Sequence, residues 1–296
     1  MTQALIGTGL MGFPIAEKIL KSNYELYVYN RTIEKAEPLI PLGAKILKSA
    51  KSAINSSDRI IIMLSDYQAI QNTIFPNNSK LDLTNKTIIQ MSTISPSESI
   101  LLGNKVNNYG GDYIEAPVLG SIPEVQSGQL IIMVSTKPKL FNKHLDILKC
   151  LGSQTFLLGD IGKASALKLA MNQLIASLTS AFSLSLAFIK EHHIDTDLFM
   201  NVLRNSALYA PTFDKKLKRI LSNDFSNPNF PTKHLEKDVK LFIKESTSLK
   251  LNTESINGVL RIIENTIKAN HTNDDYSSIY NAIIPKPNSN QQLNNI

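Results

Sequence analysis

Gly7-Thr8-Gly9-Leu10-Met11-Gly12 is the stretch that decides the fold of this 296-residue chain. It follows the apolar run Ala4-Leu5-Ile6, which is typical of a buried strand, and it precedes a helix-like segment at residues 13–21. A G-x-G-x-x-G between strand and helix is the dinucleotide-binding motif. Its first glycine allows the turn, its second lets a pyrophosphate approach the backbone, and its third lets the helix pack on the strand. We therefore expect a Rossmann domain that starts within the first residues.

The residues after the second apolar run, Glu25 to Tyr29, indicate which nicotinamide cofactor is bound. About 20 residues past the glycines, NAD-binding chains usually carry an acidic residue for the ribose hydroxyls. Here the chain reads Asn30-Arg31-Thr32, without a carboxylate. The guanidinium of Arg31 suits a phosphate dianion, and Asn30 and Thr32 would add neutral hydrogen-bond donors. The sequence predicts NADP(H) as the preferred cofactor, with NAD(H) also usable.

Composition and charge narrow the function classes. Hydrophobic residues make up 43% of the chain, enough for the cores of two domains. The formal net charge is +6, but Lys and Arg are scattered, and the compact run 215–219 has the pattern of a solvated helix face. Without a basic stripe interleaved with aromatic residues, no nucleic-acid partner is expected. Cys150 is the single cysteine and the N-terminus lacks a secretory signal pattern, so we expect a cytoplasmic protein.

Along residues 1–160, short apolar runs alternate with helical stretches, which is the pattern of a parallel sheet with crossover helices. Unbroken runs such as Ile60 to Leu64 suit strands that are buried on both faces. We expect an α/β fold here, a doubly wound parallel sheet of the Rossmann type. The strands expected after the first two lie at residues 45–46, 60–64, 87–91, 112–114, 130–134 and 154–157.

From residue 161 the pattern becomes helical. Residues 163 to about 192 contain neither proline nor glycine, so we expect one helix about 45 Å long. It is apolar and long enough to span a membrane, but Lys168, Asn172 and several serines interrupt it, and no aromatic belt flanks it. We expect instead an interdomain helix leading into an all-α domain at 161–284, then a disordered tail at 285–296. The apolar helix also indicates a homodimer or homotetramer.

Lys168 is the candidate proton donor in the second domain. It lies in the second turn of the long helix, and Asn172 follows at i+4, so both side chains share one face of that helix. A lysine in a dry environment has a lowered pKa and can protonate an alkoxide as hydride arrives. On this pattern alone an alternative stays open, in which the lysine stem covers apolar surface and the ammonium reaches water. No cluster of metal ligands is visible, so no metal is expected.

Together with these features, further motifs in the same order resemble those of the β-hydroxyacid dehydrogenase family, and within it the glyoxylate/succinic semialdehyde reductase branch. The resemblance covers all of the chain but the tail. Besides the glycine motif, it is carried by Asn30-Arg31-Thr32, Ser92-Thr93-Ile94-Ser95-Pro96, Glu115-Ala116-Pro117-Val118-Leu119-Gly120-Ser121, the set Gly162, Lys168 and Asn172, and residues 230–238.

The resemblance implies a role for each motif. Hydride moves between the nicotinamide C4 and the substrate carbonyl carbon, while Lys168, supported by Asn172, gives or takes the proton of the oxygen. Thr93 and Lys237 contact the cofactor, and Asp238 helps to hold the site together. The expected cofactor contacts also include Met63 and Leu64 at the end of the strand 60–64, and Ser92 is expected to bind substrate.

One departure from the family pattern concerns the substrate. Leu119 stands where the family usually has Ser, so a hydroxyl that helps to bind the substrate carboxylate is missing. Backbone N–H groups at Gly120 and Ser121, and the Ser121 hydroxyl, are expected to bind the anion in its place. Leu119 makes the pocket more apolar, which favours a substrate with a larger apolar part.

The leading hypothesis is an NADPH-dependent reductase of a small carboxylate-bearing aldehyde or 2-oxo acid, such as glyoxylate or succinic semialdehyde. An NAD(P)-dependent 3-hydroxy acid dehydrogenase is the alternative within the same class. From another class, the chain could be a nucleotide-binding interaction module without catalysis, against which the presence of Lys168, Asn172 and Lys237 argues.

Overall fold

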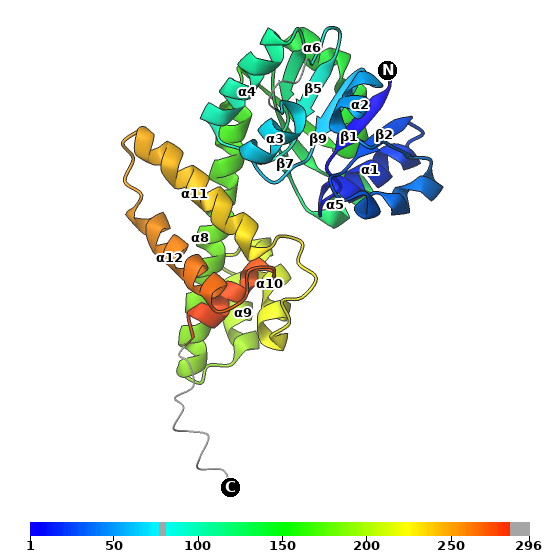
Figure 1. The fold of residues 1–296 in the computed structure, drawn as a ribbon. Coiled ribbons are helices and arrows are strands. Elements are labelled where there is room, and N and C mark those ends of the chain that lie inside the picture. Colours follow the sequence, from blue (N-terminus) through cyan, green and yellow to red (C-terminus); the bar gives the residue numbers. More distant parts are fainter. Residues whose placement is uncertain (77–80, 285–296) are drawn as a thin grey trace. The chain divides into compact units, whose positions relative to one another are not determined.

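The computed structural model describes residues 1–76 and 81–284. The chain divides into two compact units, unit 1 up to Ala170 and unit 2 from Met171 onward, so that the division falls inside helix α8 (Lys163–Glu191). Each unit is described by itself. The tail predicted at residues 285–296 lies outside the described residues (Figure 1).

Unit 1 is built on a nine-stranded sheet in the order β3-β2-β1-β4-β5-β6-β8-β7, with β9 paired to β8. The run from β3 to β6 is parallel throughout, in the strand order of a dinucleotide-binding fold, as predicted. At the other end β8 runs antiparallel to β6 and β7, so this part of the sheet is mixed. The strands are β1 (Gln3–Ile6), β2 (Leu26–Tyr29), β3 (Lys45–Ile46), β4 (Arg59–Ile62), β5 (Thr87–Gln90), β6 (Asp112–Glu115), β7 (Val118–Leu119), β8 (Ile131–Ser135) and β9 (Gln154–Gly159).

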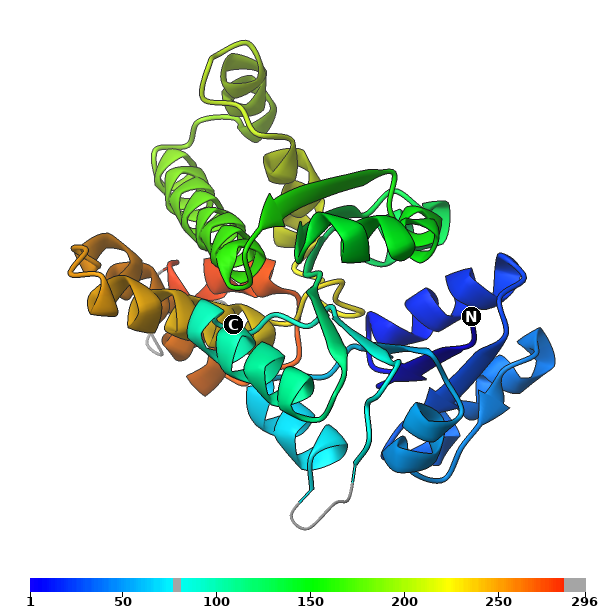
Figure 2. The same ribbon diagram turned by 90° about the horizontal axis from the view of Figure 1, so that it is seen from above.

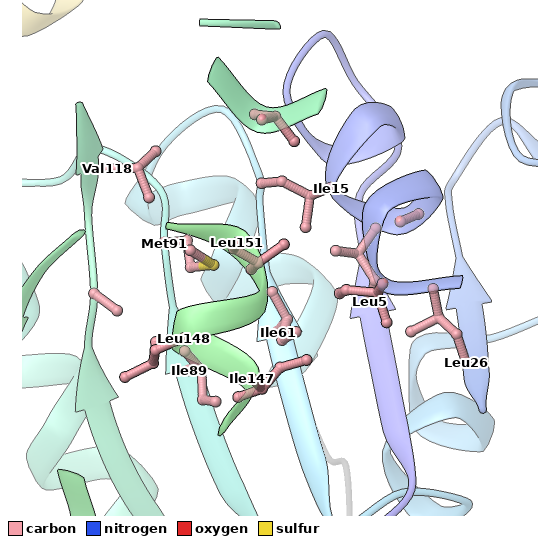
Figure 3. Close-up of a cluster of buried hydrophobic side chains, with 14 of the residues drawn as sticks. Leu5, Ile15, Leu26, Ile61, Ile89, Met91, Val118, Ile147, Leu148 and Leu151 are labelled. Carbon is pink, nitrogen blue, oxygen red and sulfur yellow. The ribbon is translucent and has the colours of Figure 1, made fainter. Parts of the chain in front are cut away.

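The helices of unit 1 cover both faces of this sheet (Figure 2). On one face, Ile61 packs with Ile15 and Leu148, and Figure 3 shows these helix residues over the strands. On the other face lie Ile60 and Ile62. Successive strand residues point to opposite faces, so two buried faces require the unbroken apolar run. The helices are α1 (Gly12–Lys21), α2 (Ala50–Asn55), α3 (Tyr67–Ile74), α4 (Pro96–Asn108), α5 (Ile122–Ser127), α6 (Pro138–Lys143) and α7 (Leu145–Leu151), with 3-10 turns η1 (Ile33–Lys35) and η2 (Glu37–Leu42).

The regular elements in the described residues of unit 2 are helices, as expected, apart from one isolated β-bridge between Pro231 and Asp275. Its two hydrophobic clusters lie along α8, one centred on Phe182 and Phe213 and the other on Leu235 and Ile263. The second cluster joins the adjacent helices α11 and α12. The elements are α8 from Met171, α9 (Thr196–Arg204), α10 (Pro211–Ser222), α11 (Thr232–Ser248), α12 (Glu254–Lys268) and the 3-10 helix η3 (Tyr276–Ala282).

The basic run at 215–219 is not a fully solvated face, which corrects the expectation from sequence. Lys216 is buried, and its Nζ donates to both carboxylate oxygens of Asp275 at 2.8 and 2.9 Å. The same ammonium lies 4.0 Å from the ring centroid of Tyr276. Burial lowers the pKa of Lys216, against the opposing effect of Asp275. Removing either partner would leave a buried unpaired charge, so the pair is expected to be structural.

Among the described residues, one helix is long and apolar enough to cross a membrane. This is α8, with a mean hydropathy of 1.3 over its most apolar window, half of which is buried. The buried core helix of a globular protein meets the same criterion.

Candidate functional site

Three glycines shape the turn between β1 and α1. Gly7 has a φ of +100°, in the left-handed region, and a Cβ there would collide with the carbonyl oxygen of Met63. A Cβ on Gly12 would collide with the carbonyl oxygen of Gly7. At Gly9 the Cβ position meets no atom of the described residues within 4 Å. The first and third glycines are therefore required by the protein's own packing, whereas Gly9 leaves room for a bound group at the backbone.

The N-terminus of α1 suits an anion. Its N-cap residue, Met11, makes no side-chain capping hydrogen bond, and the first turn carries no acidic residue. The turn is closed by the Phe13 N–H, which donates to the Gly9 carbonyl at 3.0 Å, and Leu10 is exposed beside it. N–H groups at a helix N-terminus, together with the helix dipole, bind phosphate. This end of α1 therefore fits the pyrophosphate of a dinucleotide.

Asn30 holds the glycine-rich turn to the loop that follows β2. Its Oδ1 accepts the Thr8 N–H at 3.0 Å, and its Nδ2 donates to the Thr32 carbonyl at 2.7 Å. One N–H of the Asn30 amide is thus used within the protein, and its second N–H is the donor that a cofactor phosphate could still accept. Arg31 and Thr32 are both exposed, so the Arg31 guanidinium and the Thr32 hydroxyl are available to a phosphate.

The ends of β4 and β5 meet at the same carboxyl edge of the sheet. The Met63 N–H donates to the Ile6 carbonyl at 3.0 Å, which sets the residue beside the glycine-rich turn. The Leu64 N–H donates to the buried Ser92 hydroxyl at 2.8 Å. Thr93 is half-buried next to Ser92. In parallel sheets ligands bind outside the carboxyl ends where the strand order reverses, here between β1 and β4. The predicted cofactor contacts of unit 1 therefore lie at this edge, while the structure also uses Ser92 to tie two loops together.

The first turn of α8 is held by side chains from the sheet. Glu115, the last residue of β6, accepts the Gly162 N–H at 2.5 Å and, through its other oxygen, the Ser165 N–H. The Ser135 hydroxyl accepts the Ala164 N–H at 3.0 Å. A helix start leaves such N–H groups without intrahelical partners, and here strand residues supply the acceptors. Burial raises the pKa of Glu115, although the hydrogen bonds it accepts favour its charged form.

Lys168 lies in the second turn of α8, directly after this anchored start. Only 9% of the residue is exposed. Lysine is seldom buried unless its ammonium is paired, because removing the charge from water is costly. Lys168 therefore combines a fixed backbone position with a shielded side chain, as a proton donor requires.

The segment 119–124 has a conformation that we did not predict from the sequence. Leu119 ends β7, and Gly120 follows with a φ of +131°. The Ser121 N–H and its hydroxyl both donate to Glu124 Oε2, each at 2.7 Å. The Ser121 donors expected to bind a substrate anion are thus directed at a carboxylate of the protein itself.

In unit 2 two predicted site residues, Asn172 and Lys237, both contact Asp238. Asn172 is 1% exposed, and its Nδ2 donates to Asp238 Oδ2 at 2.6 Å. Lys237 Nζ lies 2.9 Å from Asp238 Oδ1. The carboxylate fixes the orientation of the Asn172 amide. The buried Oδ1 of Asn172 has no hydrogen-bond partner among the described residues, which leaves an acceptor for a ligand hydroxyl or ammonium group.

Sequence reasoning did not identify three of these supporting side chains. Glu124 carried a readable signal, because Ser121-x-x-Glu124 is a capping box before a short helix. Ser135 carried none, since its partner lies 29 residues away. Glu115 was noted as part of a motif, but its bonds to α8 follow only from the folded sheet. No group of three or more potential metal ligands occurs within residues 1–76 and 81–284.

Two family descriptions match the chain. Residues 2–159 match the NAD binding domain of 6-phosphogluconate dehydrogenase. Residues 162–283 match the NAD-binding domain of NADP-dependent 3-hydroxyisobutyrate dehydrogenase. Together they cover both units.

Several curated proteins are similar to this chain along most of their own length. A 2-hydroxy-3-oxopropionate reductase of Escherichia coli is 31% identical over 288 residues, which are 96% of this chain and 97% of the relative. Glyoxylate/succinic semialdehyde reductase 1 of Arabidopsis thaliana is 30% identical over 243 residues, 81% of this chain and 84% of the relative.

Solved structures share the fold at lower identity. A 3-hydroxyisobutyrate dehydrogenase of Salmonella typhimurium superposes with a TM-score of 0.85 at 18% identity, covering 95% of this chain and 99% of that one. Psf3 in complex with NADP+ and 2-OPP gives 0.86 at 21% identity, covering 95% and 100%. With a glycine turn, an open helix N-terminus and an exposed Arg31 that fit a dinucleotide, the chain belongs to the β-hydroxyacid dehydrogenase family, the 3-hydroxyisobutyrate dehydrogenase-like NAD(P)-dependent oxidoreductases that act on CH–OH groups.

Proposed function

We propose that the protein is an NADPH-dependent reductase of a small aldehyde or oxo acid, with Lys168 as the proton donor. The observation that carries this proposal is the buried Lys168 in the second turn of α8, whose first turn Glu115 and Ser135 fix to the sheet edge. The relatives are named as reductases of glyoxylate and succinic semialdehyde or of 2-hydroxy-3-oxopropionate, which supports this substrate class.

The residues of unit 1 would hold the cofactor at three points. The turn around Gly9 and the N-terminus of α1 suit its pyrophosphate. Arg31, exposed at the end of β2, suits a 2′-phosphate. When bound, the nicotinamide supplies the hydride, and the protein supplies binding, orientation and the proton.

In this mechanism Lys168 protonates the carbonyl oxygen as negative charge develops on it. A positioned general acid contributes about 10²- to 10⁴-fold to such a step. Asn172 follows one helical turn later, and Asp238 fixes its amide so that Oδ1 serves as an acceptor. We assign it a part in orienting the substrate hydroxyl or the lysine. In the reverse direction the same residues would serve a 3-hydroxy acid dehydrogenase, with Lys168 taking the proton.

A non-catalytic interaction module is the competing function. Cytokine-like nuclear factor N-PAC of Drosophila melanogaster is 26% identical over 282 residues, and these residues are only 47% of that protein. The buried Lys168 and the oriented Asn172, whose Oδ1 is left as an acceptor, favour catalysis, because both lie on one face of α8 as a proton donor and a positioning residue would.

Oxidation of NADPH by a panel of semialdehydes and oxo acids, followed by absorbance, tests the proposal. Turnover that Lys168→Ala reduces at least a hundredfold is the expected result. NADPH binding with no turnover of any member would favour the interaction module.

We also propose that copies of the chain associate through the exposed side of α8. Leu184 is 60% exposed and Phe188 is 63% exposed, one helical turn apart. Large apolar side chains exposed together on a protein surface are typical of a protein–protein interface. Light scattering should show a dimer or tetramer, and Phe188→Glu should shift it towards the monomer.

A further inference from the structure

The first two turns of α8 bury one face of the helix. Ser165 and Lys168 are buried on this face, whereas Leu167 is exposed on another. Residues three apart on a helix are neighbours on one face, and side chains lean towards the N-terminus of their helix. The Lys168 side chain therefore extends from the second turn back towards the buried side of the first turn.

The carboxylate of Glu115 lies at that side of the first turn. Glu115 is fully buried, and its two oxygens accept the N–H groups of Gly162 and Ser165. These bonds favour the ionised carboxylate, against the effect of burial, which raises its pKa. One helical turn spans about 5 Å along the axis, so the negative charge lies roughly one turn before the backbone of Lys168.

Three other ionisable groups belong to this region, and they are neutral or already paired. Tyr113, on the same strand as Glu115, stays neutral because burial raises the pKa of its phenol far above the usual range. Lys163, in the first turn of α8, pairs with Asp160 at 2.8 Å, and both side chains are exposed. Solvent screens this pair, so it acts only weakly on the buried side of the helix.

One turn beyond Lys168, a second carboxylate approaches α8. Asp238 accepts a hydrogen bond from Asn172, and it also pairs with Lys237 Nζ at 2.9 Å, so its charge is balanced within unit 2. Glu115 instead accepts bonds from uncharged N–H groups. Its negative charge is therefore the one that acts on the Lys168 ammonium from the first turn of α8.

We propose that Glu115 is a positioning residue that acts through Lys168, because its carboxylate keeps the lysine ammonium protonated until a substrate oxygen takes the proton. Burial by itself favours the neutral amine of a lysine, and the positive end of the α8 dipole adds to that effect. A neutral amine has no proton to give to an alkoxide at working pH. A negative charge about one turn away opposes both effects, since buried surroundings screen it little.

This inference rests on the proposed reductase function with Lys168 as the proton donor. It adds an electrostatic role to the part that Glu115 plays in holding the start of α8. Ser135 shares the holding role, because its hydroxyl accepts the Ala164 N–H at 3.0 Å, but it carries no charge. The two residues therefore allow the charge and the anchoring to be tested separately.

The pH dependence of kcat for aldehyde reduction tests the charge. A lysine donor supports reduction only below its own pKa, so kcat should fall on the alkaline side. Glu115→Gln removes the charge and keeps the size of the side chain, and it should move this fall about one pH unit lower. Ser135→Ala is the matched control, because it loosens the same helix start without a change of charge. Its alkaline fall should stay at the wild-type pH, even if kcat is reduced.

Glu115→Asp keeps the charge on a shorter side chain, and it replaces Glu115→Gln if that variant does not fold. It should lower kcat at all pH values and leave the alkaline fall at the wild-type pH. An alkaline fall that does not move in Glu115→Gln overturns the inference. An equal shift in Ser135→Ala or in Glu115→Asp also overturns it, because the shift would then follow the geometry of the helix start and not the charge.

A direct titration of Lys168 separates this inference from the proposed function. Protein labelled with ¹³C at the lysine Cε gives an NMR signal for Lys168, which is identified by its loss in Lys168→Ala. In Glu115→Gln this signal should titrate about one pH unit lower than in the wild type. If no aldehyde is reduced but the titration shifts as expected, the reductase function fails and the electrostatic role of Glu115 stands. If aldehydes are reduced and the titration does not shift, the reductase function stands and the role of Glu115 is overturned.

Discussion

Glu115 and Ser135 lie directly opposite each other at the ends of the antiparallel strands β6 and β8, and both accept N–H groups from the first turn of α8. One cross-strand pair thus fixes the start of the helix that carries Lys168. A helix start held at two points restricts both its position and its rotation. The arrangement explains how a lysine in the second turn keeps a defined place relative to the sheet edge.

Glu115→Gln should loosen this anchor. The Gln amide keeps one acceptor but turns a donor towards an N–H, so the free energy of unfolding should fall by about 1.5–3 kcal/mol. Ser135→Ala should cost less, about 1 kcal/mol. Hydrogen exchange of the amides of Gly162 and Ser165 should accelerate, and kcat should fall while the NADPH Kd stays constant. Ser222→Ala, on the surface of α10, is the control, and unchanged exchange in Glu115→Gln would refute the anchoring role.

Arg31→Ala should remove most of the preference for NADPH over NADH. A charge-assisted bond to phosphate contributes roughly 1.5–3 kcal/mol, or about ten- to a hundredfold in affinity. Isothermal titration with both cofactors measures the ratio directly. Equal affinities of the wild type for NADPH and NADH would remove the basis of this assignment.

Asn30 should affect the cofactor site differently, because its amide joins the glycine-rich turn to the loop after β2. Asn30→Ala loses the bonds to Thr8 and Thr32, so both cofactors should bind roughly tenfold more weakly. Asn30→Asp keeps the acceptor for the Thr8 N–H but adds a negative charge beside Arg31. The affinity for NADPH should therefore fall more than the affinity for NADH. If Asn30→Ala weakens NADPH alone, the amide contacts the phosphate after all.

His144 should make the protein lose stability in mild acid. Its Nε2 lies 3.0 Å from the Thr87 hydroxyl inside the unit, and burial, aided by Arg59 and Lys143, lowers its pKa from 6.5 to about 4. Between these values the unfolded chain binds a proton that the folded protein does not, so stability falls as pH falls from 6.5 to 4. The loss amounts to at most about 3 kcal/mol.

Urea unfolding at a series of pH values checks this, with His144→Asn as the comparison. The variant removes the titrating group, so its stability should change less over the same interval. Other titrating groups contribute equally to the pH dependence of both proteins. If the two curves of stability against pH are parallel, His144 does not cause the loss of stability in acid.

The sequence predicted those parts of the fold that depend on local patterns. The run 60–64 indicated a strand buried on both faces, and β4 packs Ile60 and Ile61 against opposite helix layers. The helix from Lys163 ends at Glu191, within a residue of the predicted end. The two-residue strand β7 was not predicted, although β3, which is equally short, was predicted at its observed bounds.

The supporting contacts of the site could not be predicted, because they join residues distant in sequence. Asp275 pairs with Lys216 across 59 positions, so the basic run gave no sign that one of its members is buried. The orientation of the Asn30 amide depends on how the glycine-rich turn folds back on β2. Residue types and spacing indicated which groups could react, whereas their hydrogen-bond partners are set by the tertiary structure.

Lys168→Ala carries the mechanistic prediction. It should reduce kcat by about 10²- to 10⁴-fold, the usual scale for a positioned general acid. The NADPH Kd should hardly change, because the residues that we propose to hold the cofactor, the glycine-rich turn and Arg31, lie elsewhere in unit 1. Lys168→Arg should also be poor, since a guanidinium does not release its proton near neutral pH.

Single-turnover hydride transfer with the best aldehyde of the panel isolates the chemical step from product release. Gln173→Ala serves as a control for damage to the helix. Gln173 lies five residues after Lys168 on α8, and its Nε2 donates to the Ser177 hydroxyl at 3.0 Å. If Lys168→Ala transfers hydride at the wild-type rate, the proton comes from water or another group. The burial of Lys168 would then be a feature of packing, in which its stem fills space beside the anchored turn of α8.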